Sequence, residues 1–575
     1  MKGTFAGTIV YPERVVWLAL AVFLNTAVVL NAQPLPHGAQ VLTYLSDIDD
    51  SNQPFAVYVP RNFDPAQRYP LVISLHAEGS NHRLNLRRVL GRGNRADEGL
   101  AQATRNFPPW PDVNYLIASP FARGTMGYRG LAEADVFAVL EEMKRRYPVD
   151  EDRVYLTGIS MGGGGGLWYA LTRPDVWAAV ALVCPAPPDD SQSYAANALH
   201  LPIHLFHGSR DPVVPVSVSR AWQKTLLDAG GRVEYLEYPN VLHNSWDPAY
   251  ADTKVFRWFD QFRRNRFPDR VRFSSPAYKY AGAYWVKFDA LTPGTVASVD
   301  ARFTAPNQLV FVTGGALRGF SLNLTSHPSF RVGQPLRVEI DKTVLAIKRP
   351  GARLAFNRAP SGTWREGEAV LATGEKRPGA EGPLSEAFAG SHIYVYGTHG
   401  SPSPEEMLRR QAIARSAADW DAMGARPAYS PRILADMQVR ETDLASASLI
   451  LFGTAATNSL IARFASRAPV ALKEGAADYG LTYVVPIATP GNTATLGRYA
   501  VVNSGLPWWT GVDNINRPGQ PFVPQPYRLI ESFGDYILFK GSLSNVIAEG
   551  RFDLHWKLSA EARKAMLATG AVEIP

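Results

Sequence analysis

Over residues 33–270, short apolar runs alternate with segments in which apolar residues recur at helical spacing. Residues 132–146, for example, place Val136 and Leu140 on one side of an expected helix. The β-branched apolar runs predict strands at residues 55–60, 69–76, 113–118, 154–157, 178–183, 203–206 and 233–238. This alternation predicts an α/β domain with a mostly parallel, doubly wound sheet covered by helices on both faces.

The alternation of strand and helix patterns stops near residue 271. Short strands separated by Pro, Gly or Asn turns follow, which is typical of an all-β fold. We expect a small β-rich, sandwich-like module over residues 271–380, with strands at residues 271–273, 284–288, 299–303, 309–312, 320–324 and 336–340.

Residues 381–575 return to the α/β pattern and predict a second α/β domain, to which the sequence assigns no role. The expected strands at residues 392–398 and 448–454 both end in Gly-Thr, and a polar loop follows each. Such loops could hold an anion, but neither matches a phosphate-binding loop or a dinucleotide fingerprint. A scaffolding domain is therefore favoured over a ligand-binding domain.

Residues 1–32 have the pattern of a signal peptide. Lys2 and Arg14 precede a nearly pure apolar run at residues 15–30, and Ala32 offers a small residue for cleavage. The run is slightly short for a membrane span, so a retained anchor is the less favoured alternative. We expect a secreted or periplasmic protein without a stable membrane span after cleavage.

The 575 residues exceed one ordinary hydrophobic core and carry a formal net charge of +7 without a basic run. This dispersed charge argues against a nucleic-acid partner. Cys184 is the single cysteine, which excludes an intrachain disulfide and a cysteine-based zinc cluster, and the apolar run before it predicts a buried thiol. The composition does not indicate an oligomeric state.

The most informative motif is G-x-S-x-G at residues 158–162, between an expected strand and an expected helix. Ser160 at its apex requires a cramped backbone, in which Cβ atoms two positions before and after would collide with neighbouring segments. Gly158 and Gly162 avoid that collision. The turn directs the Ser160 hydroxyl toward unpaired N–H groups at the helix start, which suits a nucleophile whose attack generates an oxyanion.

A nucleophilic serine needs a base, usually histidine, and the histidine needs a carboxylate that orients it. Asp211 and His243 follow the last two expected strands, so they reach the same edge of the sheet as Ser160. Asp247 is a rival acid, but it lies only four residues after His243 on the same loop. We therefore expect Ser160, His243 and Asp211 to be the catalytic residues.

Two N–H groups are expected to receive the oxyanion: that of Met161 and, on the loop after the strand at residues 69–76, that of Glu78. Tyr128 and Trp246, on loops at the active edge, are expected to line the acyl or alcohol pocket. The other histidines of this region are interpreted as structural, and we expect neither a metal site nor a cofactor; they are His200, His204 and His207.

These features resemble secreted α/β-hydrolases that include feruloyl and acetylxylan esterases, polyhydroxybutyrate depolymerases and prolyl-oligopeptidase-like serine hydrolases. The resemblance covers roughly residues 40–265 and rests on residues 53–60, the loop after His76, and residues 152–155, 158–163, 208–215 and 243–246. It implies the α/β-hydrolase fold and ester hydrolysis through an acyl-enzyme without metal. Ile159, where histidine is frequent, and Ala77, where glycine is usual, depart from the family pattern and leave the subfamily open.

We therefore expect a serine carboxylesterase that cleaves feruloyl- or acetyl-type polysaccharide esters or polyesters, so its partner is a small-molecule or polymer ester. A prolyl-oligopeptidase-like peptidase is the alternative, although the β-rich module follows the catalytic domain here and the propeller of those peptidases precedes it. A non-catalytic carbohydrate- or surface-binding protein on a hydrolase scaffold is a further alternative, against which the intact Ser160, Asp211 and His243 argue.

Overall fold

The computed structural model describes residues 37–93, 98–105, 107, 109–420, 429–487, 497–512 and 526–575. The signal peptide predicted at residues 1–32 lies outside these ranges. Gly38–Pro575 form one compact unit. Within the described ranges, we find no helix with the length and apolar character that a membrane crossing requires.

The first sheet has eight strands in the order β1-β2-β4-β3-β5-β6-β7-β8. β2 pairs antiparallel with β1 and β4, and all other neighbours are parallel. This confirms the mostly parallel sheet, although β1 is an unexpected addition, because its positions are mostly half-buried and form no apolar run. The strands are β1 (Gly38–Leu45), β2 (Asn52–Val59), β3 (Tyr69–Leu75), β4 (Leu116–Pro120), β5 (Val149–Ile159), β6 (Ala179–Val183), β7 (Ile203–Gly208) and β8 (Val233–Tyr238).

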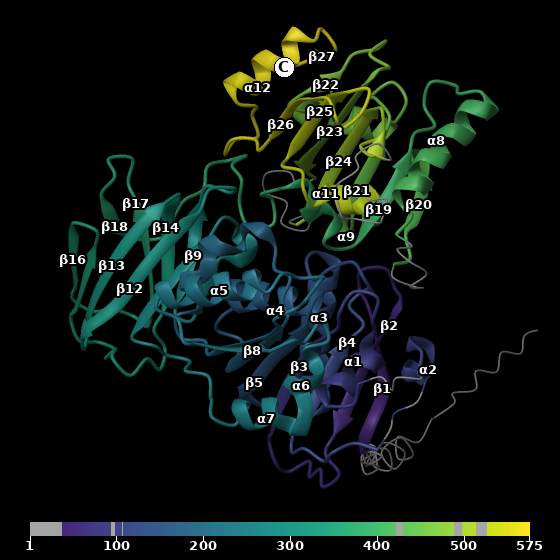
Figure 1. The fold of residues 1–575 in the computed structure, drawn as a ribbon. Coiled ribbons are helices and arrows are strands. Elements are labelled where there is room, and N and C mark those ends of the chain that lie inside the picture. Colours follow the sequence, from purple (N-terminus) through teal and green to yellow (C-terminus); the bar gives the residue numbers. More distant parts are fainter. Residues whose placement is uncertain are drawn as a thin grey trace, which may run out of the picture. The chain divides into compact units, whose positions relative to one another are not determined.

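Helices cover both faces of this sheet (Figure 1). The alternation of side chains along β5 explains the two layers: Tyr155 belongs to a core shared with α1, α6 and α7, whereas Leu156 faces Gly166 of α4 on the other side. The helices are α1 (His82–Val89), α2 (Leu100–Arg105), α3 (Leu131–Arg146), α4 (Met161–Thr172), α5 (Ser217–Asp228), α6 (Trp246–Tyr250) and α7 (Lys254–Phe259), with 3-10 segments η1 (Asp189–Ala198) and η2 (Ala251–Thr253).

Two five-stranded sheets follow, and both contribute to one hydrophobic core, with Val299 and Phe311 from one sheet and Phe320 and Phe356 from the other. This confirms the sandwich-like module. The first sheet contains β16 (Thr343–Ile347), β15 (Leu336–Ile340), β13 (Gln308–Gly315), β12 (Ala297–Ala305) and β9 (Arg270–Ser275), and the second contains β10 (Gly282–Ala283), β11 (Val286–Leu291), β14 (Leu317–Asn323), β17 (Arg353–Arg358) and β18 (Trp364–Glu366). The 3-10 segment η3 (Tyr278–Tyr280) lies between β9 and β10, and η4 (Leu384–Phe388) follows the module.

The last large sheet has the order β20-β19-β21-β24-β23-β25-β26, in which the first four strands are parallel and the rest antiparallel. The strands are β19 (His392–Tyr396), β20 (Arg432–Ala435), β21 (Ser448–Phe452), β23 (Tyr479–Pro486), β24 (Tyr499–Gly505), β25 (Tyr536–Lys540) and β26 (Val546–Gly550). Around it lie α8 (Pro404–Ala417), α9 (Glu441–Ser446), α10 (Ser459–Phe464), α11 (Pro526–Ile530), α12 (Ala560–Ala568), η5 (Asp436–Gln438), η6 (Ala465–Arg467) and a pair formed by β22 (Ala471–Leu472) and β27 (Val572–Glu573).

An internal carboxylate lies between the two Gly-Thr loops of this sheet. Asp436 Oδ1 accepts hydrogen bonds from the Thr398 N–H and hydroxyl, at 3.1 and 2.6 Å. Its Oδ2 accepts from the Ser459 N–H and hydroxyl, at 2.7 and 2.9 Å. The N–H and hydroxyl groups of Thr398 and Ser459, which could bind an anion, are thus already bonded to Asp436. This favours the interpretation of the region as a scaffolding domain.

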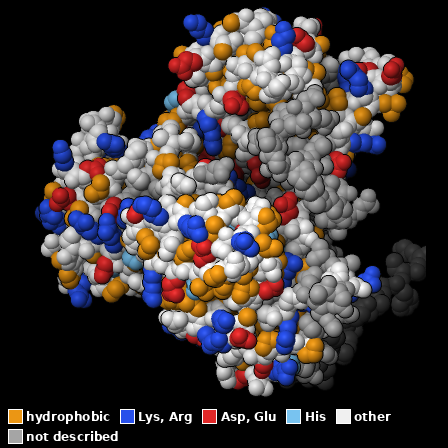
Figure 2. All heavy atoms as spheres, in the orientation of Figure 1, with side chains coloured by type: hydrophobic (Ala, Val, Ile, Leu, Met, Phe, Trp, Pro, Cys, Tyr) orange, Lys and Arg blue, Asp and Glu red, His pale blue; other side chains and the backbone are white. Residues whose placement is uncertain are grey.

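The predicted boundaries at residues 270 and 380 separate the sheets, but the described chain clusters as one unit from Gly38 onward. Those boundaries stay predictions. On the face drawn in Figure 2, basic and acidic side chains of the described residues are interspersed over all three regions.

Candidate active site

Ser160 lies at a sharp turn between β5 and α4, with φ 54° and ψ −115°. A non-glycine residue pays a steric cost in this conformation, so the surrounding turn must enforce it. The neighbouring glycines allow it: a Cβ on Gly158 would lie 2.2 Å from the Gly162 carbonyl oxygen, and one on Gly162 would lie 2.4 Å from that of Leu75. Both glycines are therefore required by close backbone approach, as the motif predicted.

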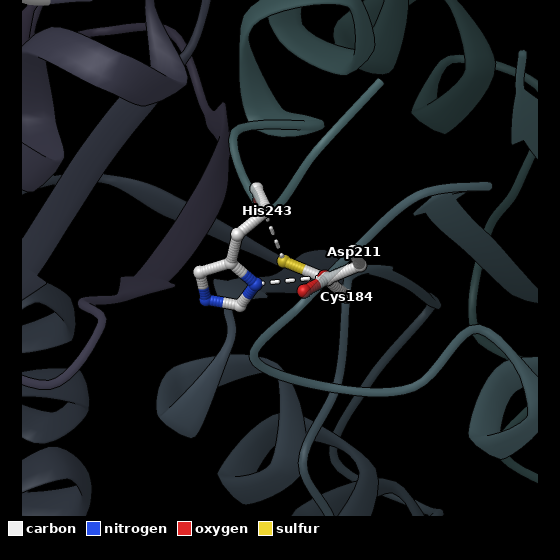
Figure 3. A group of neighbouring side chains, drawn as sticks. All are labelled: Cys184, Asp211 and His243. Atoms are coloured by element: carbon white, nitrogen blue, oxygen red, sulfur yellow. Dashed lines mark hydrogen bonds and ion pairs between the residues drawn. The ribbon is translucent and has the colours of Figure 1, made fainter. Parts of the chain in front are cut away.

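The loops after β7 and β8 bring two further side chains to Ser160. His243 Nε2 lies 3.0 Å from Ser160 Oγ, and His243 Nδ1 lies 2.7 Å from Asp211 Oδ2. Figure 3 shows the His243 ring and the Asp211 carboxylate facing each other. Because an ionised carboxylate only accepts hydrogen bonds, Nδ1 carries the proton and the lone pair of Nε2 faces the serine hydroxyl.

The Asp211 carboxylate is enclosed by donors, and its side chain is fully buried. Its Oδ1 accepts from the N–H groups of Val213 and Val214, at 2.8 and 3.0 Å. These bonds hold the carboxylate in place while its other oxygen meets His243. The rival acid, Asp247, is exposed and accepts from the Asn244 side chain at 3.0 Å instead.

His207 is a neighbour of the acid that the sequence analysis had placed only as structural. Its Nε2 lies 3.2 Å from Asp211 Oδ2 and 2.9 Å from the Val214 carbonyl, and its Nδ1 lies 2.7 Å from the Ser219 hydroxyl. Burial lowers the pKa of His207 below its usual range. The neutral His207 ring thus supports the loop that carries Asp211. In the sequence, the only indication of this role was that His207 lies four residues before Asp211.

Tyr128 is buried and supports the loop after β3. It is 4% exposed, its ring fills the space beside Gly165, and its hydroxyl donates to the His76 carbonyl at 3.0 Å. The buried His76 ring contacts the carbonyls of Ala77 and Phe121, at 2.8 and 2.9 Å. The side-chain hydroxyl of Tyr128 thus holds the loop that carries Glu78, and the expected substrate contact of Tyr128 stays a prediction.

The N–H of Met161 is the first of α4, where the helix itself supplies no acceptor. Glu78 lies on the turn between β3 and α1, whose Ser80 N–H donates to the Ala77 carbonyl at 3.1 Å. Both expected oxyanion donors thus belong to segments that flank Gly162, because that glycine packs directly against the end of β3.

Trp246 lies next to His243, and its expected role in lining the substrate pocket stays a prediction. Its half-buried ring meets the His243 ring edge to face, with centroids 5.6 Å apart at an interplanar angle of 87°. Two exposed aliphatic side chains flank the same loops: Val213 is 64% exposed and Leu242 is 54% exposed. Val213 and Leu242 thus add exposed apolar surface to the two loops that carry Asp211 and His243.

Cys184 lies beneath the base, with Sγ 3.5 Å from the His243 carbonyl oxygen (Figure 3). The thiol is buried, as predicted, and burial raises its pKa to about 12. Cys184, Asp211 and His243 bring three metal-ligating atom types together. Metals bind thiolates, whereas this environment favours the protonated thiol, so the group fits a packing contact under the hydrogen-bonded pair better than a metal site.

Comparison with known proteins identifies the same segment. Residues 135–256, which include Ser160, Asp211 and His243, match the phospholipase/carboxylesterase family. The bifunctional acetylxylan esterase/xylanase XynS20E of Neocallimastix patriciarum is 26% identical over 204 residues, 34% of this chain. The chain spans only 28% of the length of that relative.

Similar solved structures include a thermostable esterase, with 25% identity and a TM-score of 0.32 over 39% of this chain and 63% of that one. The ferulic acid esterase AmCE1/Fae1A of Anaeromyces mucronatus has 16% identity and a TM-score of 0.30, over 38% and 90% of the two chains. A putative dipeptidyl aminopeptidase IV of Bacteroides ovatus has 17% identity and a TM-score of 0.30, over 39% and 36%. The sheet order is that of an α/β-hydrolase domain, and residues 135–256 within it are similar to the phospholipase/carboxylesterase family.

Proposed function

We propose that this protein is a serine carboxylesterase in which Ser160 is the nucleophile, His243 the general base and Asp211 the residue that orients His243. The observation that carries the proposal is the unbroken hydrogen-bond chain from the Asp211 carboxylate through the imidazole to the Ser160 hydroxyl, with contacts of 2.7 and 3.0 Å. Ser160, His243 and Asp211 therefore need no rearrangement before Ser160 attacks an ester carbonyl.

In the first step, Ser160 Oγ attacks the ester carbonyl carbon while His243 Nε2 takes the hydroxyl proton. The carbonyl oxygen becomes an oxyanion, which accepts hydrogen bonds from the N–H groups of Met161 and Glu78. Collapse of this intermediate breaks the bond to the alcohol, which leaves with the proton from His243. Water then attacks the acyl-enzyme by the same route and releases the carboxylic acid, and Asp211 stabilises the transient imidazolium both times.

The proposed substrates are acetyl- or feruloyl-type esters of plant polysaccharides, or polyesters, met outside the cytoplasm. The similarity to the acetylxylan esterase/xylanase of N. patriciarum supports an acetylxylan-type ester, and the apolar side chains of Val213, Leu242 and Trp246 near the loops of the site support an apolar portion of the substrate. The apolar run at residues 15–30 supports export.

The test is a substrate panel with wild-type protein and Ser160→Ala. We expect wild-type hydrolysis of p-nitrophenyl acetate, methyl ferulate or acetylated xylan, much faster than hydrolysis of Pro-linked amides, and loss of all of it in Ser160→Ala. Faster turnover of the amides would favour the peptidase alternative. Absence of any Ser160-dependent hydrolysis across the panel would favour a non-catalytic scaffold.

A further inference from the structure

Helix α1 carries three arginines, and two of them have clear partners. Arg87 donates to both Glu98 carboxylate oxygens, at 3.1 and 2.9 Å. Arg83 donates to the backbone carbonyls of Thr104 and Arg105. Arg88 differs: within the described part of the chain, its guanidinium makes no hydrogen bond and no ion pair, and its Nε is buried without an acceptor.

Arg88 lies beside the candidate active site. Its guanidinium carbon is 4.7 Å from the centre of the Trp246 ring. The same ring contacts the His243 ring at 5.6 Å between centroids, so a single side chain separates the cation from the base. The electrostatic neighbours of Arg88 include Cys184, which lies under His243, and Asp247.

This environment leaves the charge of Arg88 poorly compensated. Burial lowers the pKa of Arg88, and the charge of Asp247 opposes that shift only in part. The nearby acid, Asp247, lies beyond ion-pair distance and is exposed, with its carboxylate bonded to Asn244. A half-buried guanidinium with unused N–H groups gains most from a carboxylate, which it binds through two parallel hydrogen bonds.

We propose that Arg88 binds a carboxylate of the substrate, so that the preferred ester carries a negative charge on its acyl or its alcohol part. Trp246 then links the two groups: its ring contacts the His243 ring edge to face, and the guanidinium that binds the carboxylate lies over it. The apolar side chains of Val213, Leu242 and Trp246 are then available to the uncharged portion of the substrate between the scissile bond and the carboxylate. This assignment rests on the proposed esterase function and narrows its substrates to anionic esters.

Matched ester pairs test the assignment. On the acyl side, the p-nitrophenyl half-esters of succinate, glutarate and adipate are compared with their methyl-capped diesters; on the alcohol side, 4-acetoxybenzoate is compared with its methyl ester. The preference is the ratio of kcat/KM between the anionic and the neutral member. Variants are Arg88→Gln, Arg88→Lys and, as a control for loss of one positive charge on an exposed neighbour, Arg92→Gln.

We expect the wild type to prefer the anionic member of at least one pair. Arg88→Gln is expected to lower that ratio about 10- to 100-fold, mainly through KM, because charge-assisted hydrogen bonds are lost. Arg88→Lys should retain part of the preference for the anionic ester. Added salt should reduce this preference in the wild type. Arg92→Gln should have the same preference as the wild type.

Two results would overturn the assignment. One is a wild type with no preference in any pair. The other is Arg88→Gln slowing both members of every pair equally, which would make Arg88 a support for Trp246 and nothing more. Ser160-dependent hydrolysis of the neutral esters alone would retain the esterase proposal while rejecting the role of Arg88, whereas no hydrolysis at all would reject both.

Discussion

At the scale of single residues, the tautomer of the His243 imidazole depends on Asp211. Its Oδ2 accepts from His243 Nδ1, while its Oδ1 is occupied by the N–H groups of Val213 and Val214. Since all of these neighbours are donors, the site requires a group that accepts on both oxygens. Only a carboxylate satisfies that requirement without presenting an N–H to one of them.

Replacing Asp211 by Asn is therefore expected to turn an amide N–H toward either His243 or the two valine N–H groups. In either case the imidazole loses the tautomer that can take the serine proton. We expect kcat/KM for a p-nitrophenyl ester to fall on the order of 10³–10⁴-fold, with little change in KM. Asp247→Asn, on the neighbouring loop, serves as the control and should stay within about twofold; equal losses in both variants would contradict the assignment of the acid.

At the scale of elements, the loops after five strands place the residues of the site at one edge of the sheet. The loops after β5, β7 and β8 carry Ser160, Asp211 and His243, and the loop after β3 carries Glu78. The loop after β4 has a supporting part, because its Tyr128 hydroxyl holds the His76 carbonyl. The oxyanion side of the site thus depends on a contact between two loops rather than on either loop alone.

Tyr128→Phe removes that contact and keeps the ring beside Gly165. The His76 carbonyl loses its donor, and the loop with the expected second oxyanion donor becomes less well held. We expect a decrease in kcat of roughly tenfold, a nearly unchanged KM, and a loss of about 1 kcal/mol in the free energy of unfolding.

Tyr147→Phe is the matched control, since the buried Tyr147 hydroxyl has no hydrogen-bond partner in the described residues. It should alter neither kcat nor stability measurably. A larger change in KM than in kcat for Tyr128→Phe would instead favour a direct substrate contact for Tyr128.

Features that depend on local sequence were predictable here, and features that depend on tertiary packing were not. The turn at Ser160 follows from its flanking glycines, and Asp211 and His243 follow from strand order. The contacts of Tyr128, His207 and Arg88 join segments far apart in the chain, which no local pattern encodes. β1 escaped prediction for a related reason, because an edge strand with half-buried positions has no apolar run.

At the scale of the whole molecule, buried polar contacts link the three regions. Asp49, after β1, pairs with Arg123 at 2.7 Å and accepts from the Ser430 N–H at 2.9 Å. Glu381 accepts from the N–H groups of Tyr278 and Lys279, at 2.6 and 2.9 Å. Such contacts are costly to break singly, so they oppose separation of the three regions.

Glu381 makes the free energy of unfolding of this protein dependent on pH. Burial raises its pKa to about 7, with Glu386 adding to the shift and the Tyr278 N–H opposing it. Between its ordinary value, about 4.5, and about 7, the folded state binds a proton that the unfolded state has released, so the contribution of Glu381 to stability falls as pH rises. We expect wild type to lose stability relative to Glu381→Gln across this window, measured by urea unfolding.

The same comparison above about pH 8 should show no further change, because Glu381 is then ionised in both states. A difference between wild type and Glu381→Gln that stays constant from pH 4.5 to 8 would contradict the raised pKa. Activity on a neutral ester, followed in parallel, separates this effect on stability from the chemistry at Ser160.

The central claim is that His243 makes the Ser160 hydroxyl reactive. Labelling with a fluorophosphonate, located by mass spectrometry of the digested protein, tests it directly. We predict that the wild type is modified on Ser160 alone, that Ser160→Ala is not modified, and that His243→Ala is modified far more slowly. Labelling of a different residue, or labelling of Ser160 at the wild-type rate in His243→Ala, would contradict the account.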